Sequence, residues 1–169
     1  AWLRQQPAFA DITAPLELQQ FRAGYSNLTY LLKMGEREFV LRRPPRGHNI
    51  ATGHDMSREY RVLSKLGPAW AKAPSPLAYQ EADDVIGAPF YVMERLRGII
   101  LRRQLPKGMT LDESQAHRLS TNLIDTLAEL HATDYQGIGL GELGKAEGYV
   151  RRQVEGWTKR YRKAQTDEH

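Results

Sequence analysis

Cysteine is absent from the 169 residues of this chain, and so are long apolar runs. Without cysteine the chain forms no disulfide and offers no thiolate ligand to a metal. Its first residues, AWLRQQP, include no apolar run of signal-peptide length. The longest apolar stretch, residues 85–93, contains a glycine and a proline and falls far short of the roughly 18 to 20 residues of a membrane span. We therefore expect a cytoplasmic protein with no membrane partner.

Positive charge exceeds negative charge by +4, but the basic residues are scattered. Basic pairs recur along the whole chain and do not gather on one helix face interleaved with aromatic residues. Much of the excess is therefore expected to be solvated surface. A basic nucleic-acid-binding domain is thus the least favoured class of function. Such a domain would bind DNA with an affinity that falls steeply as the salt concentration rises. We expect no nucleic-acid partner.

The first part of the chain is dominated by strand-like patterns, and its 41% hydrophobic residues are enough to build a core. Alternating apolar residues predict strands over residues 16–21, 28–34 and 38–41, and two more over 77–80 and 85–94. From Asp55 the apolar spacing changes to three and four residues, which predicts a helix that ends at Gly67 and Pro68. Five antiparallel strands and one helix make a small α+β lobe, residues 1–95.

Residues 96–169 have helical periodicity instead. Thr110 and Glu113 have the spacing of a capping box at the start of a helix. The apolar stripe of this helix consists of Ala116, Leu119, Leu123, Leu127 and Leu130. Residues 137–141 are expected to form a flexible connection. A second stripe follows, made of Val150, Val154, Trp157 and Tyr161. Two helices make a thin core, so we expect an exposed apolar face and possible self-association through it.

Arg42 and Glu59 are the strongest candidates for chemistry. Glu59 lies one turn after Met56 and one turn before Leu63, at the edge of the helix face that packs on the sheet. A carboxylate in that position needs a partner. Arg42 ends a strand before the helix, and its forked guanidinium reaches both a carboxylate and a phosphate oxygen. The alternative is that Glu59 faces solvent among loose surface counter-charges; in the context of the surrounding strands we favour the ion pair.

Two backbone segments are candidates for binding a nucleotide. The turn that contains Ser26 and Asn27 has the Gly, Ser and Asn composition of a phosphate-binding loop, although an ordinary hairpin has the same composition. Met93, Glu94 and Leu96 end the last strand, where exposed backbone groups can bond an adenine ring; the alternative is a plain sheet edge. The sequence contains no His-Glu-x-x-His and no serine nucleophile motif, and we assign no metal ligand.

Five motifs in this order resemble the aminoglycoside phosphotransferase-like family. They are GYSNLT (24–29), VLRRPP (40–45), REY (58–60), GAPFYVME (87–94) and LAELH (127–131). The tail, with GL (139–140), GY (148–149) and RQVEGW (152–157), looks most like the branch related to the kinase-like domains found beside acyl-CoA dehydrogenases. The resemblance covers nearly the whole chain.

This resemblance implies a protein-kinase-like fold and transfer of the γ-phosphoryl group of ATP or GTP, with Mg²⁺, to a hydroxyl of a small molecule. That acceptor would resemble an aminoglycoside, a choline or a hydroxyacyl-CoA. By position, Arg42 corresponds to the basic residue that contacts phosphate and Glu59 to its helix partner. Ser26 and Asn27 correspond to the phosphate loop, and residues 93–96 to the adenine-contacting hinge.

The chain departs from the family pattern in two ways. Arg42 stands where many kinase-like enzymes have lysine, which leaves the choice of nucleotide open. The family's His-Gly-Asp catalytic loop and Asp-containing metal motif would follow the helix that carries Trp157, beyond His169. We therefore expect the N-terminal half of a kinase, with no catalytic residue in this chain and little activity alone. The alternative is a non-catalytic kinase-like module that binds a nucleotide or a protein.

Overall fold

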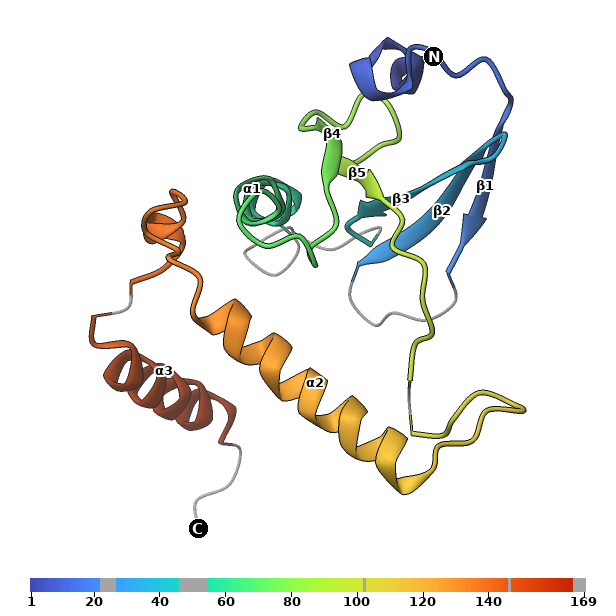
Figure 1. The fold of residues 1–169 in the computed structure, drawn as a ribbon. Helices are drawn as coiled ribbons and strands as arrows, with labels where there is room; N and C mark the ends of the chain where they lie inside the picture. Colours follow the sequence, from blue (N-terminus) through green and yellow to red (C-terminus); the bar gives the residue numbers. More distant parts are fainter. Residues whose placement is uncertain (22–26, 46–54, 102, 146, 166–169) are drawn as a thin grey trace. The chain divides into compact units, whose positions relative to one another are not determined.

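A five-stranded antiparallel sheet forms the first half of the chain in the computed structural model, which describes residues 1–21, 27–45, 55–101, 103–145 and 147–165 (Figure 1). The strands are β1 (Leu16–Gln20), β2 (Leu28–Met34), β3 (Arg37–Arg43), β4 (Pro76–Gln80) and β5 (Phe90–Glu94). They lie in the order β1-β2-β3-β5-β4. The predicted α+β class with a five-stranded antiparallel sheet is confirmed.

The last predicted strand is five residues shorter than expected. Residues 85–89 belong to no strand, and a 2.8 Å hydrogen bond from the Gly87 amide to the Asp83 carbonyl closes a turn over residues 83–87. Gly87 has φ +72°, a left-handed conformation that a strand does not contain. Val85 and Ile86 are apolar but partly exposed, so their hydrophobicity, which suggested a strand, reflects a surface turn.

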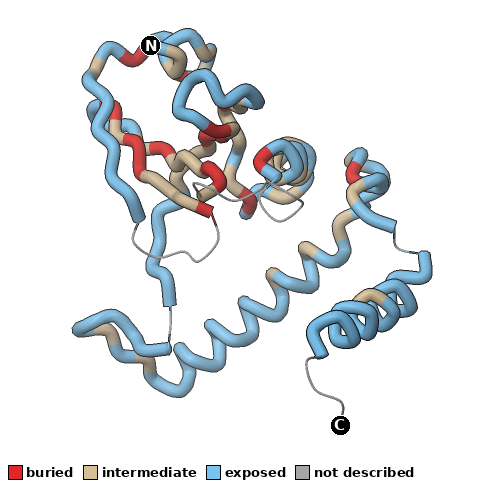
Figure 2. The backbone as a smooth tube through the Cα atoms, turned by 180° about the vertical axis from the view of Figure 1, so that it is seen from behind, coloured by how far each residue is buried: buried red, intermediate tan, exposed pale blue. Residues whose placement is uncertain are grey.

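The hydrophobic core lies on one face of the sheet and is closed by the N-terminal segment. Two short 3₁₀ turns, η1 (Trp2–Gln5) and η2 (Pro7–Phe9), bring Phe9 into contact with Phe39, edge to face at 4.8 Å. Trp2 meets Phe90 in the same way at 4.9 Å. Figure 2 shows that the buried residues gather in the sheet and these turns. Sequence patterns did not predict these turns, because so short a segment lacks periodicity.

Helix α1 (Met56–Leu66) packs against β4 and β5 (Figure 1). It begins as predicted at Asp55, whose carboxylate accepts hydrogen bonds from the Arg58 amide and the Ser57 hydroxyl. These bonds hold the pKa of Asp55 below its usual value, the Ser57 bond contributing most. On the inner side of the helix, Tyr60 stacks on Tyr79 with ring centroids 5.2 Å apart. The helix that carries Glu59 is therefore fixed to the sheet.

Helices α2 (Glu113–His131) and α3 (Tyr149–Ala164) follow. The N-cap of α2 is Asp112, and its capping box is completed by Gln115, so the predicted box of Thr110 and Glu113 is wrong by two residues. Aspartate caps as well as threonine, and a glutamine at the third position closes the box as well as a glutamate. All residues of α2 and α3 that are described are exposed or half-buried (Figure 2).

The chain divides into two compact units, Ala1–Asp134 and Tyr135–His169. The predicted division at residues 95 and 96 stays a prediction. Within the second unit, residues of the connection expected to be flexible form a hydrogen-bonded turn: the Gly139 amide donates to the Gln136 carbonyl and the Leu140 amide donates to the Tyr135 carbonyl. Whether the connection is flexible stays a prediction. Leu140 in this turn is buried, and the 3₁₀ turn η3 (Gly141–Leu143) follows it. No helix in the described residues is long and apolar enough to cross a membrane.

Candidate functional site

Arg42 and Glu59 form the predicted ion pair. Nε of Arg42 lies 3.2 Å from Oε2 of Glu59, and Nη2 donates a hydrogen bond to Oε1 at 3.3 Å. The two side chains are 33% and 31% exposed, so the pair is partly buried and open on one side. Nε itself is buried, and its contact is an ion pair without hydrogen-bond geometry, so Nε has no hydrogen-bond acceptor among the described residues. Glu59 therefore holds this arginine in place.

Two further side chains fix the Glu59 carboxylate. Asn27 donates from Nδ2 to Oε1 at 2.8 Å, and the Tyr91 hydroxyl donates to Oε2 at 2.9 Å. Both donors are buried, at 8% and 1% exposure. Asn27 immediately precedes β2, whereas Tyr91 lies opposite Arg42 on β5. The sheet and α1 thus meet at one carboxylate, which receives donors from three segments of the chain.

Sequence reasoning missed Tyr91 as a member of this site. The residue was part of a strand-like run, and nothing in the run pointed to a polar partner. The signal lies in the antiparallel register, since β3 and β5 pair with Arg42 opposite Tyr91. Residues opposite each other share a sheet face, so a correct pairing of the two strands would have placed the hydroxyl beside the arginine.

Burial raises the pKa of Tyr91 above its ordinary value near 10, and the negative charge of Glu59 raises it further. The hydroxyl is therefore neutral at physiological pH and acts as a donor to the carboxylate. Because the proton is held more tightly in the folded state, the associated stability is fully present below about pH 10 and is lost as the pH rises toward the folded-state pKa.

We expect Tyr91→Phe to lower the free energy of unfolding by roughly 1 to 3 kcal/mol at pH 8, because Glu59 loses a charge-assisted hydrogen bond. The difference in unfolding free energy between the variant and the wild type should shrink above pH 10. In that range Tyr91 ionises in the unfolded wild type but not in the folded one, which lowers the stability of the wild type alone. Urea unfolding at both pH values measures this, with Tyr149→Phe on exposed α3 as the control. A difference that stays constant from pH 8 to pH 11 would contradict the assignment.

The other predicted nucleotide-binding residues that the structure describes lie at the end of β5 and just beyond it. Ser26 lies outside the described residues. Met93 and Glu94 end β5, and the Glu94 amide bonds the Ser75 carbonyl at 2.9 Å. Leu96 lies just beyond the strand and is 54% exposed. Their roles in nucleotide binding stay predictions, as does the role of Asn27 in a phosphate loop.

Metal ligands are not assembled in this part of the molecule. Within the described residues, no group of three or more His, Asp or Glu side chains comes together in a way that would hold a metal ion. The carboxylate of Glu59 is already bonded to Arg42, Asn27 and Tyr91. We therefore assign no metal ligand and no metal-dependent step to the described residues.

Comparisons with known proteins give a family for this chain and a set of relatives. The family model described as Phosphotransferase enzyme family matches residues 17–169. Among curated proteins, the chain is 38% identical to mouse acyl-CoA dehydrogenase family member 10 over 154 residues, which is 91% of this chain. It is 37% identical to human acyl-CoA dehydrogenase family member 11 over 155 residues, or 92% of this chain. The chain spans only 14% and 20% of the length of these two relatives.

Among solved structures, the chain is similar to a protein of Ralstonia eutropha JMP134 named "putative aminoglycoside phosphotransferase". The TM-score is 0.77 at 33% identity, over 99% of this chain and 47% of the solved one. The kinase-like α+β fold expected from the motifs is thereby confirmed. Since the family model matches nearly the whole chain, the chain belongs to the phosphotransferase enzyme family.

Proposed function

We propose that this chain is the nucleotide-binding part of a phosphotransferase that moves the γ-phosphoryl group of ATP or GTP, together with Mg²⁺, to a hydroxyl of a small molecule. The family membership supports phosphoryl transfer in general. The observation that carries the proposal for this chain is the partly exposed guanidinium of Arg42, fixed on β3 by Glu59.

A fixed arginine suits a phosphate for two reasons. Phosphoryl transfer depends mainly on positioning and on neutralising charge on the phosphate oxygens, and a guanidinium does both through parallel N–H donors. Its orientation is set before the nucleotide arrives, because Glu59 is itself held by Asn27 and Tyr91. Less conformational freedom is then lost on binding. In this proposal Arg42 holds phosphate oxygens, and Glu59 holds Arg42.

The sheet face that carries Arg42 also offers an apolar surface for a base. Val40 precedes Arg42 by two residues on β3, so their side chains share a face, and Met93 lies opposite Val40 on β5. Met93 is also the first residue of the predicted hinge, which continues through Glu94 to Leu96. We propose that the base lies against Val40 and Met93 and bonds the backbone near Leu96. We assign no residue of this chain to proton transfer from the acceptor hydroxyl.

Calorimetric titration of the chain with ATP and with GTP, each with Mg²⁺, tests the proposal. We expect saturable binding with a Kd on the order of micromolar to millimolar, because the metal ligands are not provided by the described residues. The absence of saturable heat for both nucleotides would contradict the proposal, and so would nanomolar binding, which requires a complete site.

Transfer from ATP to a panel of small alcohols separates an enzyme from a non-catalytic module. We expect no measurable transfer by the 169-residue chain, and transfer once the chain is joined to the part of the solved Ralstonia eutropha relative that it does not match. Nucleotide binding without any transfer by the joined protein would favour the non-catalytic module instead.

A further inference from the structure

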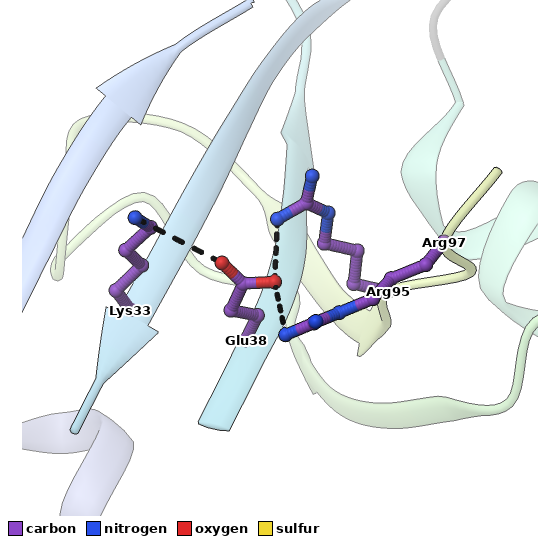
Figure 3. Close-up of polar contacts among 4 residues, drawn as sticks. All are labelled: Lys33, Glu38, Arg95 and Arg97. Carbon is purple, nitrogen blue, oxygen red and sulfur yellow. Dashed lines mark hydrogen bonds and ion pairs between the residues drawn. The ribbon is translucent and has the colours of Figure 1, made fainter. Parts of the chain in front are cut away.

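Glu38 on β3 is the centre of a second charged cluster, distinct from the one at Glu59. Its carboxylate lies 2.5 Å from Nη1 of Arg95 and 2.9 Å from Nη2 of Arg97. Lys33, opposite on β2, lies 3.9 Å away. Figure 3 shows the three cations converging on the one carboxylate from β2 and from the segment after β5. Glu38 is only 14% exposed, so its carboxylate is well shielded from water.

The two arginines flank the exposed Leu96. Pairing between β3 and β5 ends at Phe39 and Glu94, and residues 95–100 belong to no helix or strand. Without a sheet ladder, the position of this segment depends on side-chain anchors. The two arginines bind the same carboxylate from either side of Leu96. Arg95 donates a charge-assisted hydrogen bond and Arg97 forms an ion pair, and together they tie this part of the hinge to the sheet.

Glu38 and Arg42 also share one face of β3, because they are four residues apart on a strand. They are therefore about 13 Å apart along β3. Val40 lies between them on that face, with Met93 opposite. One face of the sheet thus carries a candidate for contacting phosphate at one end, an apolar surface in the middle and an anchored hinge at the other end. A nucleotide has its phosphates at one end and its base at the other, so its parts match this order.

We propose that Glu38 is a positioning residue for recognition of the nucleotide base: through Arg95 and Arg97 it holds the backbone around Leu96 where the base binds. This inference rests on the proposed function, and it adds a residue that acts on the base end of the ligand and not on its phosphates. Glu38 itself does not touch the nucleotide. Its loss releases the hinge into conformations that do not bind the base.

The experiment compares two ligands that share phosphates and differ in the base: ATP and inorganic tripolyphosphate, titrated into the 169-residue chain. For Glu38→Gln we expect ATP affinity to fall roughly 5- to 20-fold. A loss of this size results when only about 5 to 20% of the molecules have the hinge in the conformation that binds the base. Tripolyphosphate affinity should change less than about twofold, because Arg42 is untouched. Lys65→Met serves as the control, since Lys65 is an exposed lysine of α1 outside the Glu38 cluster; it should leave both affinities as they are.

Arg97→Gln repeats the test from the other side of the contact. Its side chain is 72% exposed, so the substitution does not disturb the core, and it decides the matter if Glu38→Gln fails to fold. We expect the same selective loss of ATP affinity. Unchanged ATP affinity in a folded variant overturns the inference, and so does an equal fall for ATP and tripolyphosphate, which is the mark of a general structural effect. A wild-type chain that binds neither ligand overturns the proposed function itself.

Discussion

Replacing Arg42 with alanine should weaken ATP binding to this chain by roughly 10- to 100-fold, the worth of one or two hydrogen bonds to a charged group. The guanidinium is the cation that Glu59 fixes on the sheet, and we propose that it contacts the phosphates. Arg42→Lys should have a smaller effect, because it retains the charge and loses the forked donor geometry. Calorimetric titration with ATP and Mg²⁺ measures both.

The matched control is Arg61→Ala, which removes an equal charge from the exposed side of α1. It should leave ATP affinity within about twofold, since exposed charges are well screened. Because removal of Arg42 also leaves Glu59 without its cation, the folded fraction of each variant is checked by thermal unfolding. ATP affinity equal to that of the wild type in a folded Arg42→Ala variant would show that Arg42 does not contact the nucleotide.

The second large effect concerns the apolar stripe of α3. Val150, Val154, Trp157 and Tyr161 are between 61% and 72% exposed. Side chains of this size together offer on the order of several hundred Å² of apolar surface, which soluble monomers rarely leave uncovered. We expect the purified chain to self-associate at micromolar concentration, and Val154→Ser with Trp157→Ser to return it to the monomer. Sedimentation over a range of concentrations measures the mass.

The control for this prediction places the same number of substitutions elsewhere on α3. Gln153→Ser with Thr158→Ser alters exposed polar positions and should leave self-association unchanged. If the chain with the intact stripe is a stable monomer at every concentration, this apolar surface does not drive self-association and the prediction is wrong.

Local patterns in the sequence were sufficient for the order of the elements. Alternation predicted β2 within its observed bounds, and the change to helical spacing at Asp55 predicted the start of α1. These signals are short-range, because side-chain direction follows directly from the backbone period. The same reasoning failed for residues 85–89, where apolar residues occupy a turn closed by Gly87.

The candidate site was predictable only in part, for a different reason. The pairing of Arg42 with Glu59 followed from the strand face and the helix face. Tyr91 and Glu38 were missed because their partners are set by strand register and by the return of the chain after β5. Neither leaves a periodic signal in the sequence. Contacts between distant segments decide which polar residues act together, and they become visible only once the strands are paired.

Chemical-shift mapping by NMR tests the proposed nucleotide site most directly. Spectra that include the side-chain N–H signals of arginine and asparagine are recorded during a titration with ATP. We predict that Arg42 Nε, the Asn27 side-chain amide and the backbone amides of residues 95–97 shift together with one common Kd, while Thr158 on α3 does not shift. Shifts confined to α2 and α3, or none at millimolar ATP, would contradict a nucleotide site on the Arg42 face of the sheet.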